Sequence, residues 1–365
     1  MSTEPDDRRF MAAAIRLALW HLGQTSTNPS VGCLIVNNGV IVGRGVTAPG
    51  GRPHAETQAL AEAGDKARGA TAYVTLEPCS HHGRTPPCAD ALVASGIARV
   101  VVSVTDPDTR VSGRGLRILA DAGIAVETGV LEAEGRRALA AYLTRQTKSR
   151  PQVILKLAIS SDGMIGRKGD GQIAITGPVS RAQVHALRAE TDAILVGIGT
   201  ALADDPELTV RLAGLEERSP IRIVLDRRLE LPTTSKMVRS AREIPVIVVE
   251  GQGDDADIRV EIDARRAALQ SSGVEVLEAS DLECLLFALA SRGISSLLVE
   301  GGARTARAFL DAGLVDRIVL FHGPGEIGRD GIVSPLDTAD IGEEFSLVRS
   351  AIFGADRLDE YERRI

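Results

Sequence analysis

The sequence contains a histidine, a glutamate and two cysteines whose spacing suits a hydrolytic zinc site. They are His54, Glu56, Cys79 and Cys88. One imidazole and two thiolates fill three positions of a tetrahedral Zn²⁺ and leave the fourth for water, whose pKa the metal lowers towards neutrality. Glu56 is not needed as a ligand, so it can carry a proton from that water to a departing amine. The pattern predicts one zinc ion per chain and the hydrolysis of an amine, which is a deamination.

The segment between the two cysteines is longer than in the general zinc-deaminase pattern, where only two residues separate them. Its polar side chains include those of His81, His82, Arg84 and Thr85. Because both ends of this segment would be fixed to the metal, we expect these side chains near the reacting atom. A cationic arginine and polar groups suit a substrate with a phosphate or several ring heteroatoms.

A structural zinc knot, or cysteines that only pack in a core, is the alternative interpretation. A closed structural site needs a fourth protein ligand and has no use for the neighbouring Glu56, which favours the catalytic interpretation. His81 or His82 could still supply that fourth ligand, so the sequence leaves this alternative open.

The elements that must position these residues alternate between strands and helices. Strands are expected at residues 32–36, 40–46, 72–76 and 99–104, a hairpin turn at 37–39, and helices at 9–22, from 54 onwards, at 88–95 and at 131–146. His54 and Cys88 fall at helix starts, where the positive end of the helix dipole favours a thiolate and a metal-bound hydroxide. We therefore expect a site built from helix N-termini packed on one sheet.

A short polar segment at residues 147–151 predicts a domain boundary, because it ends in a proline. The predicted domains are residues 1–147 and 151–365, and a chain of 365 residues with 44% hydrophobic composition can bury a core in each. Further strands are expected at residues 153–159, 193–196, 221–225, 245–249 and 296–299. With helices between several of them, the second domain is predicted to be α/β as well.

Two glycine-bearing turns follow predicted strands of the second domain. They are Gly197-Ile198-Gly199-Thr200 and Glu300-Gly301-Gly302-Ala303-Arg304-Thr305. Strand, glycines and helix in this order allow backbone N–H groups to approach a phosphate. Neither turn is a full G-x-G-x-x-G, so phosphate binding and plain tight turns remain equal alternatives.

Charged residues in two other places of the second domain also suggest binding. The run from Asp204 to Arg211 combines acidic and basic groups, which suits a phosphorylated polyhydroxyl ligand, although such a run can also be a solvated turn. Lys156 interrupts an apolar stretch and needs a partner or a function, unless it lies at a strand edge and extends into solvent.

Composition argues against several classes of protein. A net charge of −7 and 3% aromatic residues disfavour a nucleic-acid partner. No stretch is long and apolar enough to span a bilayer, and the N-terminal residues lack the pattern of a secretory signal, so a cytoplasmic protein without membrane partners is expected. Cys33 and Cys284 are expected to be core residues in a reducing compartment.

Motifs in both halves of the chain resemble those of the bifunctional deaminase/reductase family of riboflavin biosynthesis. The most specific is the long segment from Pro78 to Cys88. The others are Asn28-Pro29-Ser30-Val31-Gly32, His54-Ala55-Glu56, Lys156-Leu157-Ala158, Ser161-Asp162-Gly163, Ile175-Thr176-Gly177-Pro178, Asp204-Asp205-Pro206 and Val299-Glu300-Gly301-Gly302. The resemblance implies an N-terminal cytidine-deaminase-like domain of three layers and a C-terminal domain similar to dihydrofolate reductase.

The resemblance also implies the two reactions and their residues. The first domain would hydrolyse the exocyclic amine of a diaminopyrimidinone with a phosphoribosylamino group, and the second would use NADPH to reduce the ribosyl group to ribityl phosphate. It makes His54, Cys79 and Cys88 the zinc ligands and Glu56 the proton carrier. Substrate contacts are expected at Asn28, His81, Arg84 and Asp106 in the first domain and at Lys156, Arg188, Leu208, Arg211 and Glu300 in the second. Cofactor contacts are expected at Ala158, Ala174, Thr200, Asp204, Gly302, Ala303, Arg304 and Thr305.

Two regions depart from the family pattern. Gln172 and Ala174 stand where the family has a serine and then a tryptophan, so an aromatic wall against the cofactor would be lost. Residues 323–331 also differ from the usual glycine turn. We still expect an active reductase, and a homo-oligomer, either a dimer or a tetramer. The alternatives are a deaminase whose second domain has lost reduction, an RNA-base deaminase with an accessory domain, and a zinc-stabilised interaction module.

Overall fold

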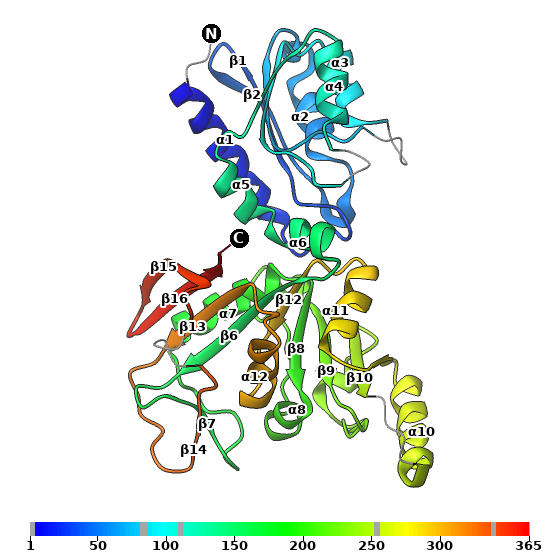
Figure 1. Ribbon diagram of the computed structural model, residues 1–365, viewed down its shortest axis with the longest axis vertical. Helices are drawn as coiled ribbons and strands as arrows, with labels where there is room; N and C mark the ends of the chain where they lie inside the picture. The colour runs from blue at the N-terminus through cyan, green and yellow to red at the C-terminus, as the bar shows by residue number, and fades with distance from the viewer. Residues whose placement is uncertain (1–3, 81–85, 109–111, 252–255, 337–340, 365) are drawn as a thin grey trace. The chain divides into compact units, whose positions relative to one another are not determined.

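The computed structural model describes residues 4–80, 86–108, 112–251, 256–336 and 341–364. Its contacts divide the chain into two compact units, Met1–Ser149 and Arg150–Ile365 (Figure 1). Each unit has its own sheet and its own buried core, so the predicted α/β fold class is confirmed. Within the described ranges, no helix is long and apolar enough to cross a membrane.

The sheet of the first unit has the strand order β2-β1-β3-β4-β5. The strands are β1 (Gly32–Asn37), β2 (Val40–Val46), β3 (Thr71–Leu76), β4 (Arg99–Val104) and β5 (Ala125–Thr128). Strand β1 is antiparallel to β2 and β3, whereas β3, β4 and β5 are parallel. Asn38 and Gly39, between β1 and β2, both have positive φ, 51° and 76°, as the predicted Asn-Gly hairpin requires.

Helices cover both faces of this sheet and complete three layers (Figure 1). On one face pack α2 (Ala55–Ala63), α3 (Cys88–Ala94), α4 (Arg114–Asp121) and α6 (Ala140–Lys148), and on the other α1 (Glu4–Ala18) and α5 (Glu132–Ala138). Strand β1 serves both cores because its side chains alternate: Cys33 and Ile35 face the first set of helices, and Leu34 and Val36 face the second.

Two glycines of β2 allow α2 to lie directly against the sheet. A Cβ atom at Gly43 would stand 2.1 Å from the carbonyl oxygen of Ala59, and one at Gly45 would stand 2.1 Å from that of Ala55. Ala55 is the first residue of α2, and His54 is its N-cap. This close approach therefore fixes the end of the helix that carries a predicted metal ligand.

The second unit is built on a sheet with the strand order β11-β10-β9-β8-β12-β6-β13-β16-β15. Its strands are β6 (Gln152–Ile159), β8 (Ala193–Gly197), β9 (Ile221–Leu225), β10 (Val246–Gly251), β11 (Glu275–Ala279), β12 (Ser296–Val299), β13 (Arg317–His322), β15 (Phe345–Phe353) and β16 (Asp356–Arg363). Neighbours from β11 to β13 are parallel, whereas β16 is antiparallel to both β13 and β15. Strands β7 (Met164–Arg167) and β14 (Gly331–Val333) pair separately.

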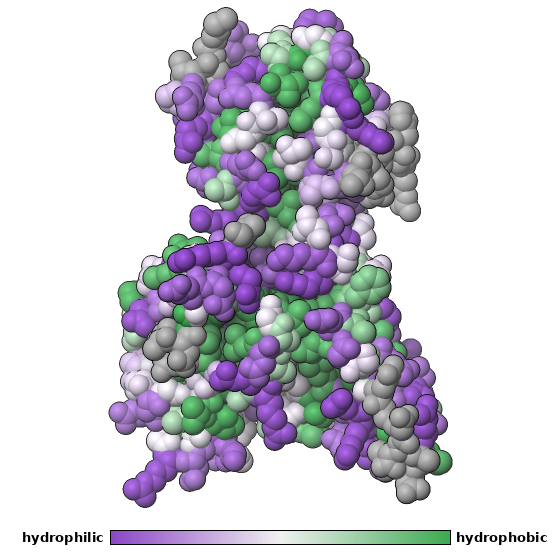
Figure 2. All heavy atoms as spheres, in the orientation of Figure 1, coloured by the Kyte–Doolittle hydropathy of each residue, from purple (hydrophilic) through white to green (hydrophobic). Residues whose placement is uncertain are grey.

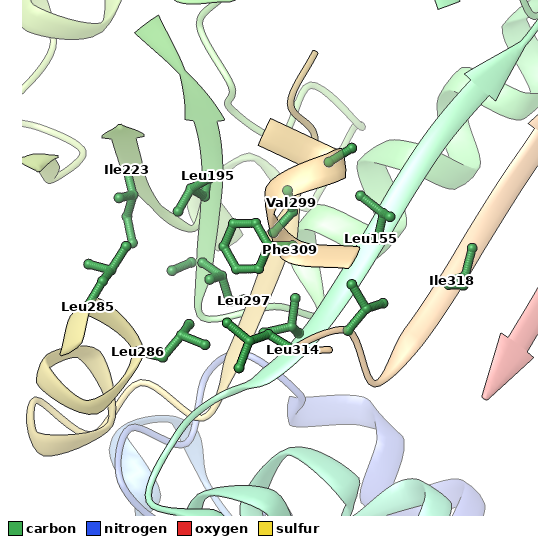
Figure 3. Close-up of a cluster of buried hydrophobic side chains, with 14 of the residues drawn as sticks. Leu155, Leu195, Ile223, Leu285, Leu286, Leu297, Val299, Phe309, Leu314 and Ile318 are labelled. Carbon is green, nitrogen blue, oxygen red and sulfur yellow. The ribbon is translucent and has the colours of Figure 1, made fainter. Parts of the chain in front are cut away.

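Helices also cover both faces of this larger sheet. One face carries α11 (Leu282–Ser291) and α12 (Ala303–Asp311), and the other carries α7 (Pro178–Ala189), α8 (Ile198–Asp204), α9 (Lys236–Arg239) and α10 (Ala256–Ser271). Figure 3 shows the first of these cores, in which the Phe309 ring of α12 lies among Leu195, Leu297 and Val299. The face of the unit seen in Figure 2 mixes hydrophilic and hydrophobic residues.

Three sequence predictions differ from the structure. The first helix begins at Glu4 and ends at Ala18, and a 3₁₀ turn, Leu19–His21, follows it. The helix predicted at residues 131–146 is two helices, α5 and α6, because Leu139 between them leaves helical geometry with φ −99° and ψ 7°.

The third difference concerns Cys284, which is exposed although a core position was predicted. It lies in the first turn of α11, where its backbone N–H donates to the N-cap Asp281. The core-facing residues of that helix are Leu285, Leu286 and Leu289. Cys33, by contrast, is buried in β1 as predicted.

Candidate active sites

The ligand atoms of His54, Cys79 and Cys88 come together in the first unit, within 4.8 Å of one another. Nδ1 of His54 lies 3.3 Å from Sγ of Cys88 and 3.7 Å from Sγ of Cys79. Bonds of about 2.0 Å to nitrogen and about 2.3 Å to sulfur in a tetrahedral site give ligand–ligand distances of roughly 3.5 Å. The residues present therefore fit a zinc ion, with Nδ1 as the histidine ligand atom.

Two helix starts and one strand end position these three ligands. His54 is the N-cap of α2, Cys88 is the first residue of α3, and Cys79 follows β3. The backbone N–H of Cys88 donates to Sγ of Cys79 over 3.3 Å. The prediction that helix N-termini hold His54 and Cys88 is thus confirmed.

The electrostatics of this cluster affect its thiols and Glu56. The hydrogen bond from the Cys88 thiol lowers the pKa of Cys79 to about 4, and the same bond, together with burial, raises the pKa of Cys88. Glu56 is 4% exposed. Burial, and after it the charge of Cys79, raises the pKa of Glu56 to about 7. A carboxyl group with a pKa near neutrality can both accept and release a proton at the pH of most cells.

A cavity of about 310 Å³ opens at this cluster, and His54, Glu56 and Cys79 line it. Its other lining residues are Thr27, Asn28, Pro29, Val31, Thr47, Leu76, Glu77, Asp106, Asp108, Tyr142, Arg145 and Gln146. The structure thus brings the expected contacts Asn28 and Asp106 to the same cavity as the ligands. The other two expected contacts, His81 and Arg84, lie outside the described residues, as do His82 and Thr85.

Sequence reasoning missed Glu77, a buried residue just before the Pro78-Cys79 motif. Its carboxylate accepts hydrogen bonds from the backbone N–H groups of Gly113 and Gly115, at 3.0 and 3.1 Å, and from that of Asp106 at 3.4 Å. A Cβ at Gly115 would stand 2.1 Å from the carbonyl oxygen of Pro78. Glu77 therefore holds the start of α4 and the segment after β4 against the metal ligands. Only its position beside Cys79 could have pointed to it.

Lys156, Arg188 and Glu300 form a charged cluster within the second unit. Nε and Nη2 of Arg188 donate to the two carboxylate oxygens of Glu300 at 2.8 and 3.0 Å, and Nζ of Lys156 lies 3.7 Å from Oε2. The three side chains are only 10% to 15% exposed. Burial alone would raise the pKa of Glu300, but the charges of Arg188 and Lys156 outweigh it and lower the pKa to about 2.

The sheet register explains why Lys156 reaches Glu300. Strand β6 lies between β12 and β13, and Leu155 is paired with Val299. The residues that follow these two, Lys156 within β6 and Glu300 just after the end of β12, are therefore level with each other. Lys156 therefore lies on an interior strand and has Glu300 as its charged partner. The alternative, a lysine that extends into solvent from a strand at the edge of the sheet, is wrong.

The two glycine-bearing turns lie next to each other, after the adjacent strands β8 and β12. The backbone N–H of Gly302 donates to Oγ1 of Thr200 over 3.0 Å. A Cβ at Gly197 would stand 2.4 Å from Oγ1 of Thr305, and one at Gly301 would stand 2.7 Å from Cβ of the same residue. Both glycines therefore permit the first turn of α12 to approach the β8 turn closely.

The remaining expected cofactor positions lie on β6, α8, α12 and the segment between β7 and α7. Ala158 is half-buried on β6, Ala303 begins α12, and Arg304 is exposed in the first turn of that helix. Asp204, the last residue of α8, is half-buried, and burial raises its pKa. Ala174 and Gln172 are both exposed in the segment between β7 and α7.

Helix α7 holds the segment that contains Leu208 and Arg211. Leu208 is buried and has a positive φ of 56°. Arg188 donates to the carbonyl oxygen of Thr209 over 3.1 Å, and the backbone N–H of Arg211 donates to Nδ1 of His185 over 3.2 Å. Sequence reasoning missed His185, although its place three residues before Arg188 sets both on one side of α7.

The region at residues 323–331, which departs from the family pattern, is tied to the Ser161-Asp162-Gly163 motif. The Asp162 carboxylate accepts from the backbone N–H groups of Ile327 and Gly328 at 3.1 and 2.7 Å. The backbone N–H of Ser161 donates to the carbonyl oxygen of Gly325 over 2.9 Å. These hydrogen bonds hold the turn at residues 323–331 in place, although its glycine spacing differs from the family pattern.

Two family models match different parts of the chain. Residues 151–356 match the RibD C-terminal domain, and residues 4–104 match the cytidine and deoxycytidylate deaminase zinc-binding region. Among curated relatives, the riboflavin biosynthesis protein RibD of Aquifex aeolicus is 40% identical over 348 residues, which cover 95% of each chain. That of Escherichia coli is 41% identical over 338 residues, which cover 89% of each chain.

Solved structures of RibD proteins are also similar to this chain over nearly its whole length. A structure of Acinetobacter baumannii RibD is similar with a TM-score of 0.86 and 36% identity, covering 100% of both chains. The diaminohydroxyphosphoribosylaminopyrimidine deaminase/5-amino-6-(5-phosphoribosylamino)uracil reductase of Thermotoga maritima is similar with a TM-score of 0.86 and 34% identity, covering 99% of both chains.

Proposed function

The chain belongs to the RibD family of riboflavin-biosynthesis enzymes, and on this premise we propose which residues perform each of its two reactions. It is a bifunctional enzyme with a zinc-dependent deaminase domain and a reductase domain. The deaminase acts on 2,5-diamino-6-(5-phosphoribosylamino)pyrimidin-4(3H)-one, and the reductase converts the ribosyl group of the product to ribityl phosphate.

Deamination is assigned to the first unit, with His54, Cys79 and Cys88 as the zinc ligands. When bound there, zinc supplies a water molecule whose pKa is near neutrality. Glu56 accepts one proton from the water and delivers it to a ring nitrogen, and it then transfers the second proton of that water to the amine, which leaves as ammonia. Asn28 and Asp106 bind the substrate in the cavity. The observation that carries this proposal is the meeting of three zinc-binding atoms within 4.8 Å beside a cavity that Glu56 lines.

Reduction is assigned to the second unit, with NADPH as the cofactor that supplies a hydride when it is bound. Thr200 and residues 302–305 are proposed to bind the cofactor, because the first turns of α8 and α12, whose backbone N–H groups lack intrahelical partners, lie next to each other there. Lys156, Arg188 and Arg211 give the positive charge that the substrate phosphate and a developing negative charge require. Glu300 holds Lys156 and Arg188 in place through the contacts at 2.8 to 3.7 Å.

A deaminase that has lost its reductase is not favoured. The second unit matches the RibD C-terminal domain and contains a buried cluster of Lys156, Arg188 and Glu300. We extend the proposal to a homo-oligomer in the cytoplasm. Light scattering of the purified protein tests the oligomer, and a monomer at micromolar concentration would contradict it.

The experiment that tests the assignment uses Glu56→Gln in the full-length zinc-loaded enzyme. We expect the rate of ammonia release to fall about 10²- to 10⁴-fold, which is the usual contribution of a general acid–base group to the rate of a reaction. Zinc content, and NADPH oxidation with the deaminated intermediate, should equal those of the wild type. Glu62→Gln is the matched control, because Glu62 is partly exposed on the same helix and pairs with Arg44. Full ammonia release by Glu56→Gln would remove Glu56 from the mechanism.

A further inference from the structure

Tyr142 is a buried residue of α6 whose hydroxyl group reaches the deaminase cavity. It donates to both carboxylate oxygens of Asp106, at 3.1 Å to Oδ1 and 3.0 Å to Oδ2. The two side chains come from segments 36 residues apart in the chain, and both residues line the cavity that holds Glu56 and the metal ligands. Tyr142 is 9% exposed and Asp106 is 5% exposed.

The contacts of Asp106 leave part of its carboxylate available to a ligand. Oδ1 also accepts from the backbone N–H of Asp108 at 2.9 Å, whereas the only described donor to Oδ2 is Tyr142. An ionised carboxylate offers about four lone-pair sites, so Oδ2 retains acceptor capacity, and Asp106 lines the cavity. A pyrimidine ring with amino and ring N–H groups presents donors, which is the complementary chemistry.

The surroundings of Asp106 oppose its negative charge, and Tyr142 counteracts them. Burial raises the pKa of Asp106, and the neighbouring carboxylates of Asp108 and Glu77 act in the same direction. The hydrogen bonds from the Asp108 N–H and from Tyr142 lower it. A hydroxyl that bridges both oxygens also limits rotation of the carboxylate group, so it determines where the remaining lone pairs of Oδ2 point.

We propose that Tyr142 is a positioning residue for deamination, which aims the Asp106 carboxylate at the N–H donors of the aminopyrimidine ring. The inference rests on the proposed deaminase function of the first unit and adds to it the residue that orients a substrate contact. Tyr142 acts through Asp106 and takes no part in the proton transfers of Glu56. Its contribution is therefore to substrate binding, and loss of the hydroxyl group should appear in KM more than in kcat.

The test is a double-mutant cycle in the full-length, zinc-loaded enzyme with Tyr142→Phe, Asp106→Asn and the double variant. Removing a hydrogen bond that orients a metal ligand typically costs about 10- to 100-fold in affinity or activity, and we expect an effect of the same order for a substrate-binding carboxylate. We expect Tyr142→Phe to lower kcat/KM for ammonia release about tenfold or more, mainly through KM. The double variant should be no worse than Asp106→Asn alone, because Tyr142 has nothing left to orient.

Tyr73→Phe is the matched control, since the Tyr73 hydroxyl donates to the buried carboxylate of Asp7 over 2.6 Å within the same unit but away from the cavity. It should lower thermal stability and leave KM unchanged. An unchanged KM in Tyr142→Phe, or independent effects that multiply in the double variant, would overturn the inference. Absence of ammonia release from the wild type would instead overturn the proposed function, so the two failures are distinguishable.

Discussion

Glu300 is the shared carboxylate partner of two cations in the interior of the second unit, so we predict that it contributes to stability in addition to its proposed role in reduction. Its carboxylate binds the Arg188 guanidinium through two hydrogen bonds and lies 3.7 Å from the Lys156 ammonium group. Removing one partner of a buried ion pair leaves the remaining charge without compensation in a medium of low polarity. Substitution of Glu300 should therefore destabilise the second unit as a whole.

We predict that Glu300→Gln lowers the free energy of unfolding of the second unit by about 3–5 kcal/mol, the range for breaking a buried ion pair. Urea unfolding followed by circular dichroism measures it. Glu261→Gln is the control, because Glu261 forms an exposed pair with Arg265 one helical turn away and should cost under about 0.5 kcal/mol. Equal effects of the two substitutions would contradict the prediction.

The stability that Glu300 contributes should depend on pH, and its pKa determines the direction of that dependence. The folded-state pKa of Glu300, about 2, lies below the unfolded value of 4.5. A lowered carboxyl pKa stabilises the fold above the unfolded value, and the stabilisation is lost as the pH falls through the folded value. The difference in unfolding free energy between the wild type and Glu300→Gln should therefore have its full value above about pH 4.5 and decrease as the pH falls towards 2.

At the scale of elements, helix α2 depends on its contact with β2 to place His54 and Glu56. The Cβ of Gly45→Ala would stand 2.1 Å from a backbone oxygen at the start of α2, so the helix must move. We predict a loss of about 1–3 kcal/mol in unfolding free energy, typical of overpacking, together with weaker zinc binding and slower ammonia release. Gly325→Ala is the control, since no atom lies within 4 Å of its added Cβ. Wild-type zinc affinity in Gly45→Ala would refute the prediction.

Local patterns predicted most elements, because strands such as β4 and β12 are short runs of apolar residues between turn signals. The cluster of His54, Cys79 and Cys88 was predictable for the same reason, since the spacing of these residues is itself the signal. Tyr142 was not, because its hydrogen-bond partner is 36 residues away and its apolar ring makes it resemble a core residue. The break at Leu139 was also missed, because residues 131–146 carry no proline, and Gly135 lies inside α5.

At the scale of the whole molecule, each unit has a separate sheet and separate core clusters. The proposed zinc ligands all lie in the first unit, and the cluster around Glu300 lies in the second. We predict that removal of zinc by a chelator abolishes ammonia release and leaves the rate of NADPH oxidation with the deaminated intermediate within about twofold of the untreated rate. Restoring zinc should recover deamination. A parallel loss of both activities would show that the metal also stabilises the second unit.

The position of β16 affects the order in which the two sheets can form during translation. All five strands of the first sheet are made before residue 129, so that unit can fold while translation continues. Strand β15 precedes β16 in the chain but joins the second sheet only through it, because β16 lies between β13 and β15. Until residues 356–363 have left the exit tunnel, one edge of β13 has no partner strand. A nascent chain can therefore form the first sheet well before β16 is made and covers the edge of β13.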